Sequence, residues 1–331
     1  MLIAAAAVAF LVIQPAVESQ PAEPATPPVA GTGMAAVRQF IVLPDDGIQP
    51  LLDLIDAAGS RVYMKMYLLT DTRIVDALSR AQGRAADVRV MIEENPFGAG
   101  NSAQQALDLL KQAGLRTKSA NPAFRLTHEK SFVIDDTAVI LTANMTKAAF
   151  SRNREFGVVI AEPADVEEVA AAFIADWERS AFTPGRPDLV WSPDNSREQI
   201  DRVIEAAVNS LDVYAEVVLD ARHVHKLAQA ARRGVRVRLL ISPPSQGETN
   251  SSSPGLDELQ AGGVGVRTVR SPYIHAKAFV ADGALAYTGS VNISTASMDF
   301  NRELGVLLAD RGSIQRMTDA FERDWNRGVE R

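Results

Sequence analysis

Two segments of the chain carry apolar residues at a spacing of three to four, which is the period of an amphipathic helix. Their apolar positions are Leu51, Leu54, Ile55 and Ala58 in one segment and Ile200, Val203, Ile204 and Ala207 in the other. A short apolar strand, a second helix and a Val/Ile-rich strand follow each segment. The predicted second helices are 72–81 and 221–232, and the predicted Val/Ile-rich strands are 88–92 and 235–241. Helices that alternate with buried strands predict an α/β fold.

Two pairs of short strands come later in the chain. They are predicted at 131–134 with 138–141, and at 278–281 with 284–287. The residues between the strands are Asp135-Asp136 in one pair and Asp282-Gly283 in the other, and such residues suit a hairpin turn. A further helix follows each hairpin, at 164–177 and at 313–325.

The same order of elements occurs twice because the chain contains an internal duplication. NREFGVVI begins at Asn153, and the similar NRELGVLL begins at Asn301. A further similarity upstream places Lys65 against Glu216. We therefore predict two lobes, 35–183 and 184–331, which are joined within residues 179–188.

Residues 1–34 differ from the rest of the chain. The apolar run 2–13 is shorter than the ~20 residues that a membrane-crossing helix needs, so it is closer to the core of a signal peptide, although a positive flank is missing. We interpret 1–17 as a signal peptide or short anchor and 18–34 as a Pro/Ala-rich linker. This interpretation predicts export to the periplasm or the medium.

Composition and charge narrow the classes of function. The chain has 331 residues, of which 47% are hydrophobic, so it can bury a large core. It contains no Cys, which excludes a disulfide framework and a thiolate metal site. Its net charge of −7 disfavours binding to a nucleic-acid backbone, because strong binders of that kind are usually basic.

Two of the four histidines have the same neighbours, a Lys two residues later and an Asp seven residues later. The two sets are His128, Lys130 and Asp135, and His275, Lys277 and Asp282. One such match is expected by chance in roughly one chain in two hundred, so two matches within a duplication indicate a functional motif. The other two histidines have no counterpart in the first lobe, and we interpret them as structural.

The spacing within each motif suggests a chemistry. Residues two apart on a strand point to the same side, so His128 projects with Lys130 and His275 projects with Lys277. If the two copies pack about a pseudo-two-fold axis, both pairs meet in one pocket. That set suits a phosphodiester: ammonium groups hold the phosphate oxygens, one imidazole attacks phosphorus and the other protonates the leaving oxygen. We predict no metal and no cofactor.

The two motifs, followed by LTAN in the first copy and TGSVN in the second, resemble the phospholipase D superfamily over residues 37–328. The resemblance implies a bilobal α/β/α sandwich with one active site between the halves, and a phosphohistidine intermediate. It makes His128 the nucleophile and His275 the general acid. It further implies that Lys130, Lys277, Asn144, Ser290 and Asn292 contact phosphate, that Glu155 and Glu303 orient the histidines, and that Asp135 and Asp282 support the catalytic set.

One segment departs from this pattern. The second copy has Gly289-Ser290-Val291-Asn292, whereas the first has Thr142-Ala143-Asn144, which we align as one residue shorter. Thr142 is the candidate to replace the missing serine hydroxyl.

The resemblance and the export signal together favour a phospholipase D-type phosphodiesterase that hydrolyses or exchanges phospholipid head groups at a membrane surface. Two alternatives are a cardiolipin synthase-like phosphatidyltransferase, a class that usually carries two membrane helices, and an exported endonuclease with the same catalytic set. A binding module without activity is disfavoured, because both motifs are intact. Since one chain holds both motifs, we expect a monomer.

Overall fold

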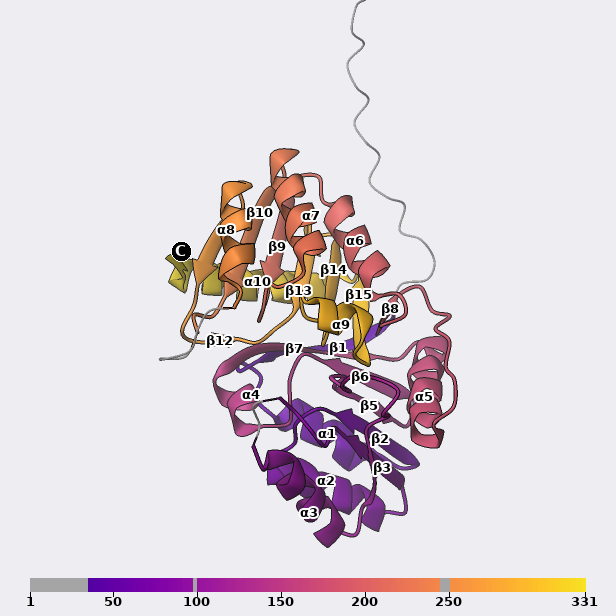
Figure 1. Ribbon diagram of the computed structural model, residues 1–331. Helices are drawn as coiled ribbons and strands as arrows, with labels where there is room; N and C mark the ends of the chain where they lie inside the picture. Colours follow the sequence, from indigo (N-terminus) through magenta and orange to yellow (C-terminus); the bar gives the residue numbers. More distant parts are fainter. Residues whose placement is uncertain (1–34, 98–99, 245–250) are drawn as a thin grey trace, which may run out of the picture. The chain divides into compact units, whose positions relative to one another are not determined.

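The computed structural model describes residues 35–97, 100–244 and 251–331 (Figure 1). The predicted signal peptide or anchor at 1–17 and the predicted linker at 18–34 lie outside the described residues, so export stays a prediction. Within the described part, the chain forms two eight-stranded sheets with helices, and the halves repeat one another. The predicted duplicated α/β fold is thereby confirmed.

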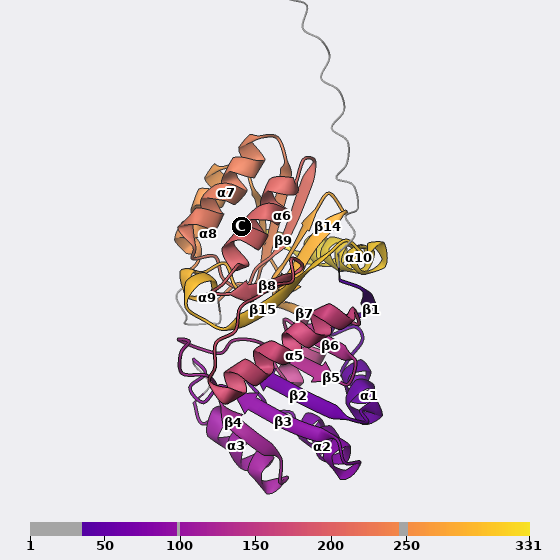
Figure 2. The ribbon, with the colours of Figure 1, turned by 90° about the vertical axis from the view of Figure 1, so that its right-hand side faces the viewer.

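The first half builds one sheet. Its elements are β1 (Val37–Leu43), α1 (Gln49–Ala57), β2 (Arg61–Met66), α2 (Thr72–Gly83), β3 (Asp87–Ile92), α3 (Ser102–Gln112), β4 (Arg116–Ser119), β5 (Ser131–Ile134), β6 (Thr137–Leu141), α4 (Lys147–Ser151), β7 (Asn153–Ile160) and α5 (Pro163–Glu178). The strand order is β1-β7-β6-β5-β2-β3-β4. Helix α5 lies across the strands in Figure 2, on the face opposite to α1, α2 and α3.

The second half builds the other sheet. Its elements are β8 (Leu189–Ser192), α6 (Ser196–Ala206), β9 (Ser210–Tyr214), α7 (Ala221–Arg232), β10 (Arg236–Ile241), α8 (Ser253–Ala261), β11 (Gly265–Thr268), β12 (Tyr273–Ile274), β13 (Ala278–Ala281), β14 (Leu285–Gly289), α9 (Thr295–Asp299), β15 (Glu303–Leu308), α10 (Arg311–Arg327) and β16 (Val329–Glu330). The strand order is β16-β11-β10-β9-β13-β14-β15-β8. Strand β12 does not belong to this sheet and instead pairs with β7 of the first half.

Three large hydrophobic clusters hold the layers together. One lies between the first sheet and α1, α2 and α3, and a matching one lies between the second sheet and α6, α7 and α8. The third joins the inner faces of both sheets to α5 and α10, and it includes Phe156, Trp191, Tyr214 and Phe321. The two halves therefore share a core, and removing apolar surface from water is the main force that holds them together. No described helix has the length and hydropathy to cross a membrane.

The strand pairing corrects two details of the sequence alignment. The predicted hairpins form, but the turn between β5 and β6 has two residues and the turn between β13 and β14 has three. The extra residue of the second copy lies in this turn. Thr142, Ala143 and Asn144 therefore match Ser290, Val291 and Asn292 without a gap. The predicted shortening of the first copy at this point is wrong.

The second detail concerns the strands β2 and β9. In β2, Met64 pairs with Phe132, and in β9, Val213 pairs with Phe279. Since Phe132 and Phe279 each follow the motif lysine by two residues, Lys65 corresponds to Tyr214 and not to Glu216. The counterpart of Glu216 is Tyr67, because Tyr67 follows Lys65 by two residues and Glu216 follows Tyr214 by two residues.

Candidate active site

Each His-x-Lys segment is held by the opposite half of the chain. The backbone N–H of His128 donates to the carbonyl of Arg302 at 2.9 Å, and that of Ala276, next to His275, donates to the carbonyl of Arg154 at 2.9 Å. The segments lie just before β5 and β13 rather than within them, which corrects the predicted placement on a strand. Each motif lysine nevertheless lies beside its histidine, because its Nζ donates to the carbonyl of that histidine.

The two histidines are also paired with carboxylates from the opposite halves. His128 Nδ1 lies 2.9 Å from Glu303 Oε2, and His275 Nδ1 lies 2.7 Å from Glu155 Oε1. Both carboxylates are fully buried. Because Nδ1 is engaged in each ring, Nε2 is the nitrogen left for chemistry. The predicted Glu partners are therefore brought to the histidines, and the contacts cross between the halves.

Buried ion pairs fix the segments that supply these carboxylates. The guanidinium of Arg302 contacts Asp176 of α5 at 3.0 Å, and that of Arg154 contacts Asp324 of α10 at 2.7 Å. Asp176 also contacts Lys65 Nζ at 2.7 Å. Burial alone would raise the pKa of Asp176, but the charges of Lys65 and Arg302 lower it to about 2. Arg154 and Arg302 belong to the repeated Asn-Arg-Glu motif, so both the Arg and the Glu of that motif have a place in the site.

The two motif lysines have different partners. Lys130 Nζ donates to the His128 carbonyl at 2.7 Å, and no described carboxylate lies within 4.0 Å of it. Burial first, and then the charge of Lys277, lower the pKa of Lys130 to about 7. Lys277 Nζ donates to the His275 carbonyl at 2.6 Å and forms an ion pair with Glu216 at 2.6 Å. An anionic ligand can therefore relieve the repulsion between two buried cations.

A cavity of about 340 Å³ opens onto the histidines of both halves. Its lining residues are Tyr67, Leu68, Phe97, Leu126, His128, Asn144, Glu216, Val217, His275, Asn292, Ser297 and Asn301. The side-chain oxygens of Asn144 and Asn292 are buried and have no hydrogen-bond partner in the described chain. Both asparagines were predicted as phosphate contacts, and they lie at equivalent positions beside the histidines. The two motif lysines are buried and are not among the residues that line the cavity.

Ser290 lies outside the cavity, contrary to its prediction as a phosphate contact. Its hydroxyl accepts from the N–H of Leu304 at 3.1 Å and donates to the carbonyl of the same residue at 3.3 Å. Thr142 has the matching role in the first half, since its hydroxyl accepts from Phe156 N–H at 2.8 Å and donates to Glu155 at 2.6 Å. Thr142 therefore occupies the position that corresponds to Ser290. Both hydroxyls form hydrogen bonds to the neighbouring strand.

Asp135 and Asp282 are not brought to the cavity either. Strands β5 and β13 lead away from it, and the two Asp residues lie in the hairpin turns at their far ends. Asp135 accepts from the backbone N–H groups of Gly59, Ser60 and Arg61, all within 2.9 Å. Asp282 accepts in the same way from residues 208–210. Their prediction as members of the catalytic set is corrected to a structural role, because each carboxylate is used to bind the chain that leads into β2 or β9.

Among the cavity residues that the sequence did not predict, two contact the motif histidines. Tyr67 and Glu216 follow β2 and β9 at equivalent positions, and each lies beside the histidine of its own half. The Tyr67 ring lies 4.6 Å from the His128 ring, edge to face, and Glu216 Oε1 lies 3.4 Å from His275 Nε2. A sequence alignment of the two copies in the correct register would have placed Tyr67 against Glu216. It would have shown that this position differs between the halves.

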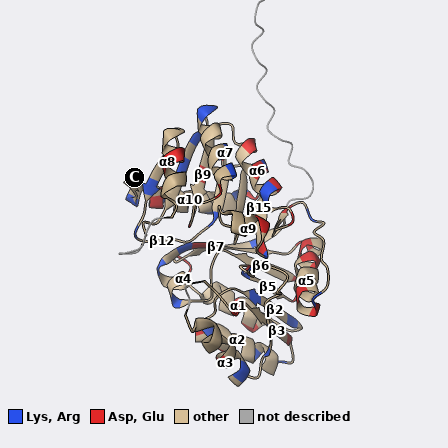
Figure 3. Ribbon diagram, in the orientation of Figure 1, with Lys and Arg blue, Asp and Glu red and all other residues tan. Residues whose placement is uncertain are grey.

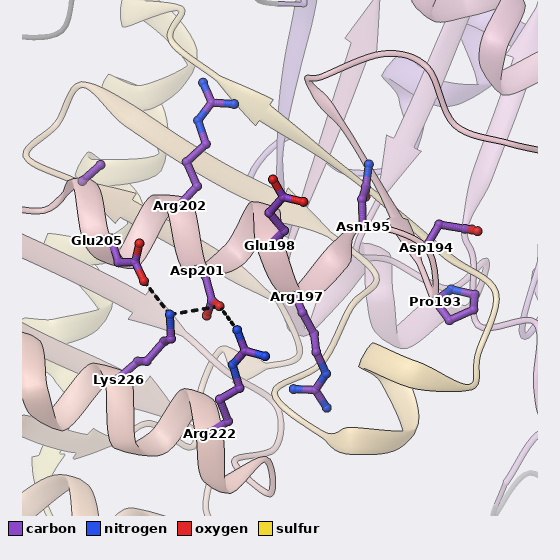
Figure 4. Close-up of a pocket in the computed structure, with 11 residues that line it drawn as sticks. Pro193, Asp194, Asn195, Arg197, Glu198, Asp201, Arg202, Glu205, Arg222 and Lys226 are labelled. Atoms are coloured by element: carbon purple, nitrogen blue, oxygen red, sulfur yellow. Dashed lines mark hydrogen bonds and ion pairs between the residues drawn. The ribbon is translucent and has the colours of Figure 1, made fainter.

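A second, larger cavity of about 770 Å³ lies along α6 and α7, away from the histidines of the motifs (Figure 4). Lys226 is paired there with Glu205 and with Asp201, and Arg222 is paired with Asp201. These cations are already neutralised by carboxylates, so they are poor candidates to bind a substrate phosphate. Among the residues that the structure describes, no cluster of three or more His, Cys, Asp or Glu has the arrangement of a metal site.

The fold and the cavity define a duplicated α/β protein in which each half contributes one His-Lys pair to a common site. The family model described as cardiolipin synthase, phospholipase D-like domain, matches residues 51–177 and 200–325. The chain belongs to this family and thus to the phospholipase D superfamily.

Two curated relatives of this chain are named as cardiolipin synthases. A cardiolipin synthase of Oceanobacillus iheyensis is 22% identical over 323 residues, which cover 85% of this chain and 67% of that protein. Cardiolipin synthase A of Pseudomonas aeruginosa is 33% identical over 138 residues, which cover 40% of this chain and only 28% of that protein. The relatives therefore contain long stretches that have no counterpart in the matched part of this chain.

Solved structures share the fold. The phosphatidylserine synthase of Haemophilus influenzae is 14% identical, with a TM-score of 0.67, and the match covers 90% of this chain and 89% of that chain. The polyphosphate kinase of Porphyromonas gingivalis is 15% identical, with a TM-score of 0.66, and the match covers 87% of this chain and 50% of that chain. At these identities the comparison concerns the fold alone.

Proposed function

We propose that the protein transfers the phosphatidyl group of a phospholipid to an alcohol, in the manner of a cardiolipin synthase, through a phosphohistidine intermediate. The observation that carries the proposal is the pair of crossed contacts, His128 with Glu303 and His275 with Glu155. They hold two imidazoles at one cavity with Nε2 of each available. Two such groups meet the two needs of phosphodiester exchange, a nucleophile and an acid–base group.

The surroundings of His128 favour it as the nucleophile. Burial first, and then the charge of Lys130, lower the pKa of His128, so the neutral imidazole is favoured at neutral pH. A neutral Nε2 has the lone pair that attack on phosphorus requires. The carboxylate of Glu303 then stabilises the positive charge that the ring acquires as the nitrogen–phosphorus bond forms.

The reaction proceeds in two steps. In the first, Nε2 of His128 bonds to phosphorus, the bond to the head-group oxygen breaks, and His275 gives its proton to that oxygen. In the second, His275 takes the proton of an alcohol whose oxygen attacks phosphorus, and the bond to His128 breaks. In this proposal Lys130, Lys277, Asn144 and Asn292 stabilise the phosphate oxygens, where charge increases in both transition states.

The comparisons favour transfer over the hydrolysis that the sequence favoured. Hydrolysis and transfer need the same groups and differ only in whether water or an alcohol enters the second step. The curated relatives quoted above are cardiolipin synthases, whose name describes a transfer to an alcohol. A role as a nuclease receives less support, because the chain is acidic and helix α5 carries acidic residues without a single Lys or Arg (Figure 3).

Product analysis tests this proposal. Purified protein is incubated with phosphatidylglycerol vesicles that contain labelled phosphatidyl chains, with and without added ethanol. The proposal predicts phosphatidyl alcohols or cardiolipin as the main labelled products. Phosphatidic acid as the main labelled product, even at high alcohol concentration, would contradict the proposal and support hydrolysis instead.

A further inference from the structure

The cavity has two chemically different sides, although the chain that builds it is duplicated. Tyr67 and Glu216 occupy the same position in the two halves. The Tyr67 ring faces His128 and lies 5.1 Å from Lys130 Nζ, whereas the Glu216 carboxylate faces His275 and Lys277. The lining also contains the apolar residues Leu68, Phe97 and Leu126, as well as Val217 next to Glu216. The pseudo-symmetry is therefore broken at one position beside each histidine.

A carboxylate is an unexpected group in a site for an anionic substrate. Burial alone would raise the pKa of Glu216, but the charges of His275 and Lys277 lower it well below its usual range, so the group is ionised. It repels phosphate oxygens, which costs affinity for the reacting group itself. Its side chain is 24% exposed, so it remains accessible from the cavity while it contacts Lys277. A partly exposed anion suits a hydrogen-bond donor on the substrate.

The geometry shows which part of the substrate this donor belongs to. The oxygen that His275 protonates must lie within hydrogen-bond distance of its Nε2, about 3 Å, in the reacting complex. Glu216 Oε1 lies 3.4 Å from the same nitrogen. The leaving or entering oxygen is therefore close to this carboxylate, and a polar atom on the adjoining carbon of the same alcohol lies within its reach.

We propose that Glu216 selects the alcohol that leaves and enters, by binding a hydroxyl or ammonium group on the carbon next to the one that bears the reacting oxygen. A vicinal diol such as glycerol and an amino alcohol such as ethanolamine share this chemistry. The proposal rests on the proposed function, with His275 as the acid–base group. It places an alcohol subsite around Glu216, on the side of the cavity that faces His275.

Competition between acceptors of equal size tests the proposal. Phosphatidylglycerol vesicles are incubated with an equimolar mixture of ethylene glycol and 1-propanol, and the two phosphatidyl alcohols are measured from the same tube. We expect the wild type to favour the diol by about tenfold or more, because a hydrogen bond to a charged group is worth about 1.5–3 kcal/mol. A parallel mixture of 2-aminoethanol and 1-propanol distinguishes an ammonium donor from a hydroxyl donor.

The decisive variants are Glu216→Gln, which removes the charge, and Glu216→Leu, which removes the acceptor. The preference for the diol should fall in the first and approach unity in the second. Because both products form in one tube, their ratio does not depend on how much of a variant is folded. Glu258→Gln is the matched control, since Glu258 is a carboxylate near His225 outside the cavity. Its preference and its rate should equal those of the wild type.

Two kinds of failure are distinguishable. If the wild type forms phosphatidyl alcohols without preference, or if Glu216→Leu retains the preference, the role of Glu216 is overturned and the proposed transfer stands. If the wild type forms no phosphatidyl alcohol from any of the three acceptors, the proposed function fails and the role of Glu216 fails with it.

Discussion

Nδ1 of His128 lies 2.9 Å from Oε2 of Glu303, although the two residues belong to opposite halves of the chain. His275 and Glu155 form the reciprocal pair at 2.7 Å. Neither half therefore completes a histidine–carboxylate pair by itself, and the site exists only when both halves are assembled. The backbone contacts between each His-x-Lys segment and the opposite Asn-Arg-Glu segment lead to the same conclusion.

The crossed pairs predict the effect of Glu303→Gln and Glu155→Gln. An amide can donate as well as accept, so it can stabilise the wrong tautomer of the histidine. We expect each variant to lower kcat by about 10²–10⁴, as for other histidines that a carboxylate orients. The measurement is the initial rate of product formation from phosphatidylglycerol vesicles. Retention of activity within threefold in either variant, with the thermal midpoint unchanged, would show that the contact has no catalytic role.

Lys130 predicts how anion binding depends on pH. Its pKa is lowered to about 7, so the side chain is an ammonium ion below that pH and a neutral amine above it. Affinity for a phosphate mimic should therefore weaken as the pH rises from 6 to 8. Sulfate is a suitable probe, because its charge is constant over this range, and calorimetry measures its Kd. Lys130→Met should bind sulfate weakly at both pH values, and a wild-type Kd that does not change with pH would contradict the prediction.

The turn carboxylates predict an effect on stability. Asp135 accepts from three consecutive backbone N–H groups, which Asn cannot reproduce with one oxygen. We expect Asp135→Asn and Asp282→Asn to lower the free energy of unfolding by about 1–3 kcal/mol each. The activity of the folded fraction should remain that of the wild type. Denaturant titration together with kcat checks this, and a selective loss of kcat without loss of stability would restore the catalytic interpretation.

Asp176 predicts a larger effect on stability. It is buried between Lys65 and Arg302, so Asp176→Asn leaves two cations without their shared partner. We expect the free energy of unfolding to fall by about 3–5 kcal/mol. The control is Asp194→Asn, because Asp194 contacts the same arginine at 3.3 Å from a partly exposed position. A similar small change in both variants would mean that the buried network does not hold the halves together.

The sequence predicted the repeated elements well, because their apolar spacing is regular and their boundaries coincide with turn residues. Helix 221–232 was predicted at its observed bounds. Strands β1 and β12 are among the strands that were not predicted, and both pair with β7, which was not predicted either. Local patterns cannot identify a strand whose partner is distant in the chain.

The candidate site was predicted in part. The histidines and lysines follow from their repetition, since each occurs at matching places in both copies, whereas the asparagines and glutamates followed from the resemblance to the phospholipase D superfamily. The crossing of the pairs could not be predicted, because either glutamate is compatible with either histidine until the packing of the halves is known. Ser290, Asp135 and Asp282 were misplaced for a related reason: a repeated polar residue can stabilise a repeated turn or strand as readily as a repeated site. Glu216 was missed because the alignment was out of register at β9.

The central claim is that His128 forms the covalent intermediate and that His275 supplies and accepts the proton. It is tested most directly with the variants His128→Asn and His275→Asn and a phosphodiester whose leaving group needs no proton. After a short reaction and a denaturing quench, mass spectrometry locates any phosphorylated histidine. We predict an adduct on His128 that persists in His275→Asn, and no adduct in His128→Asn. An adduct on His275 in His128→Asn, with none on His128 in the other variant, would contradict the assignment.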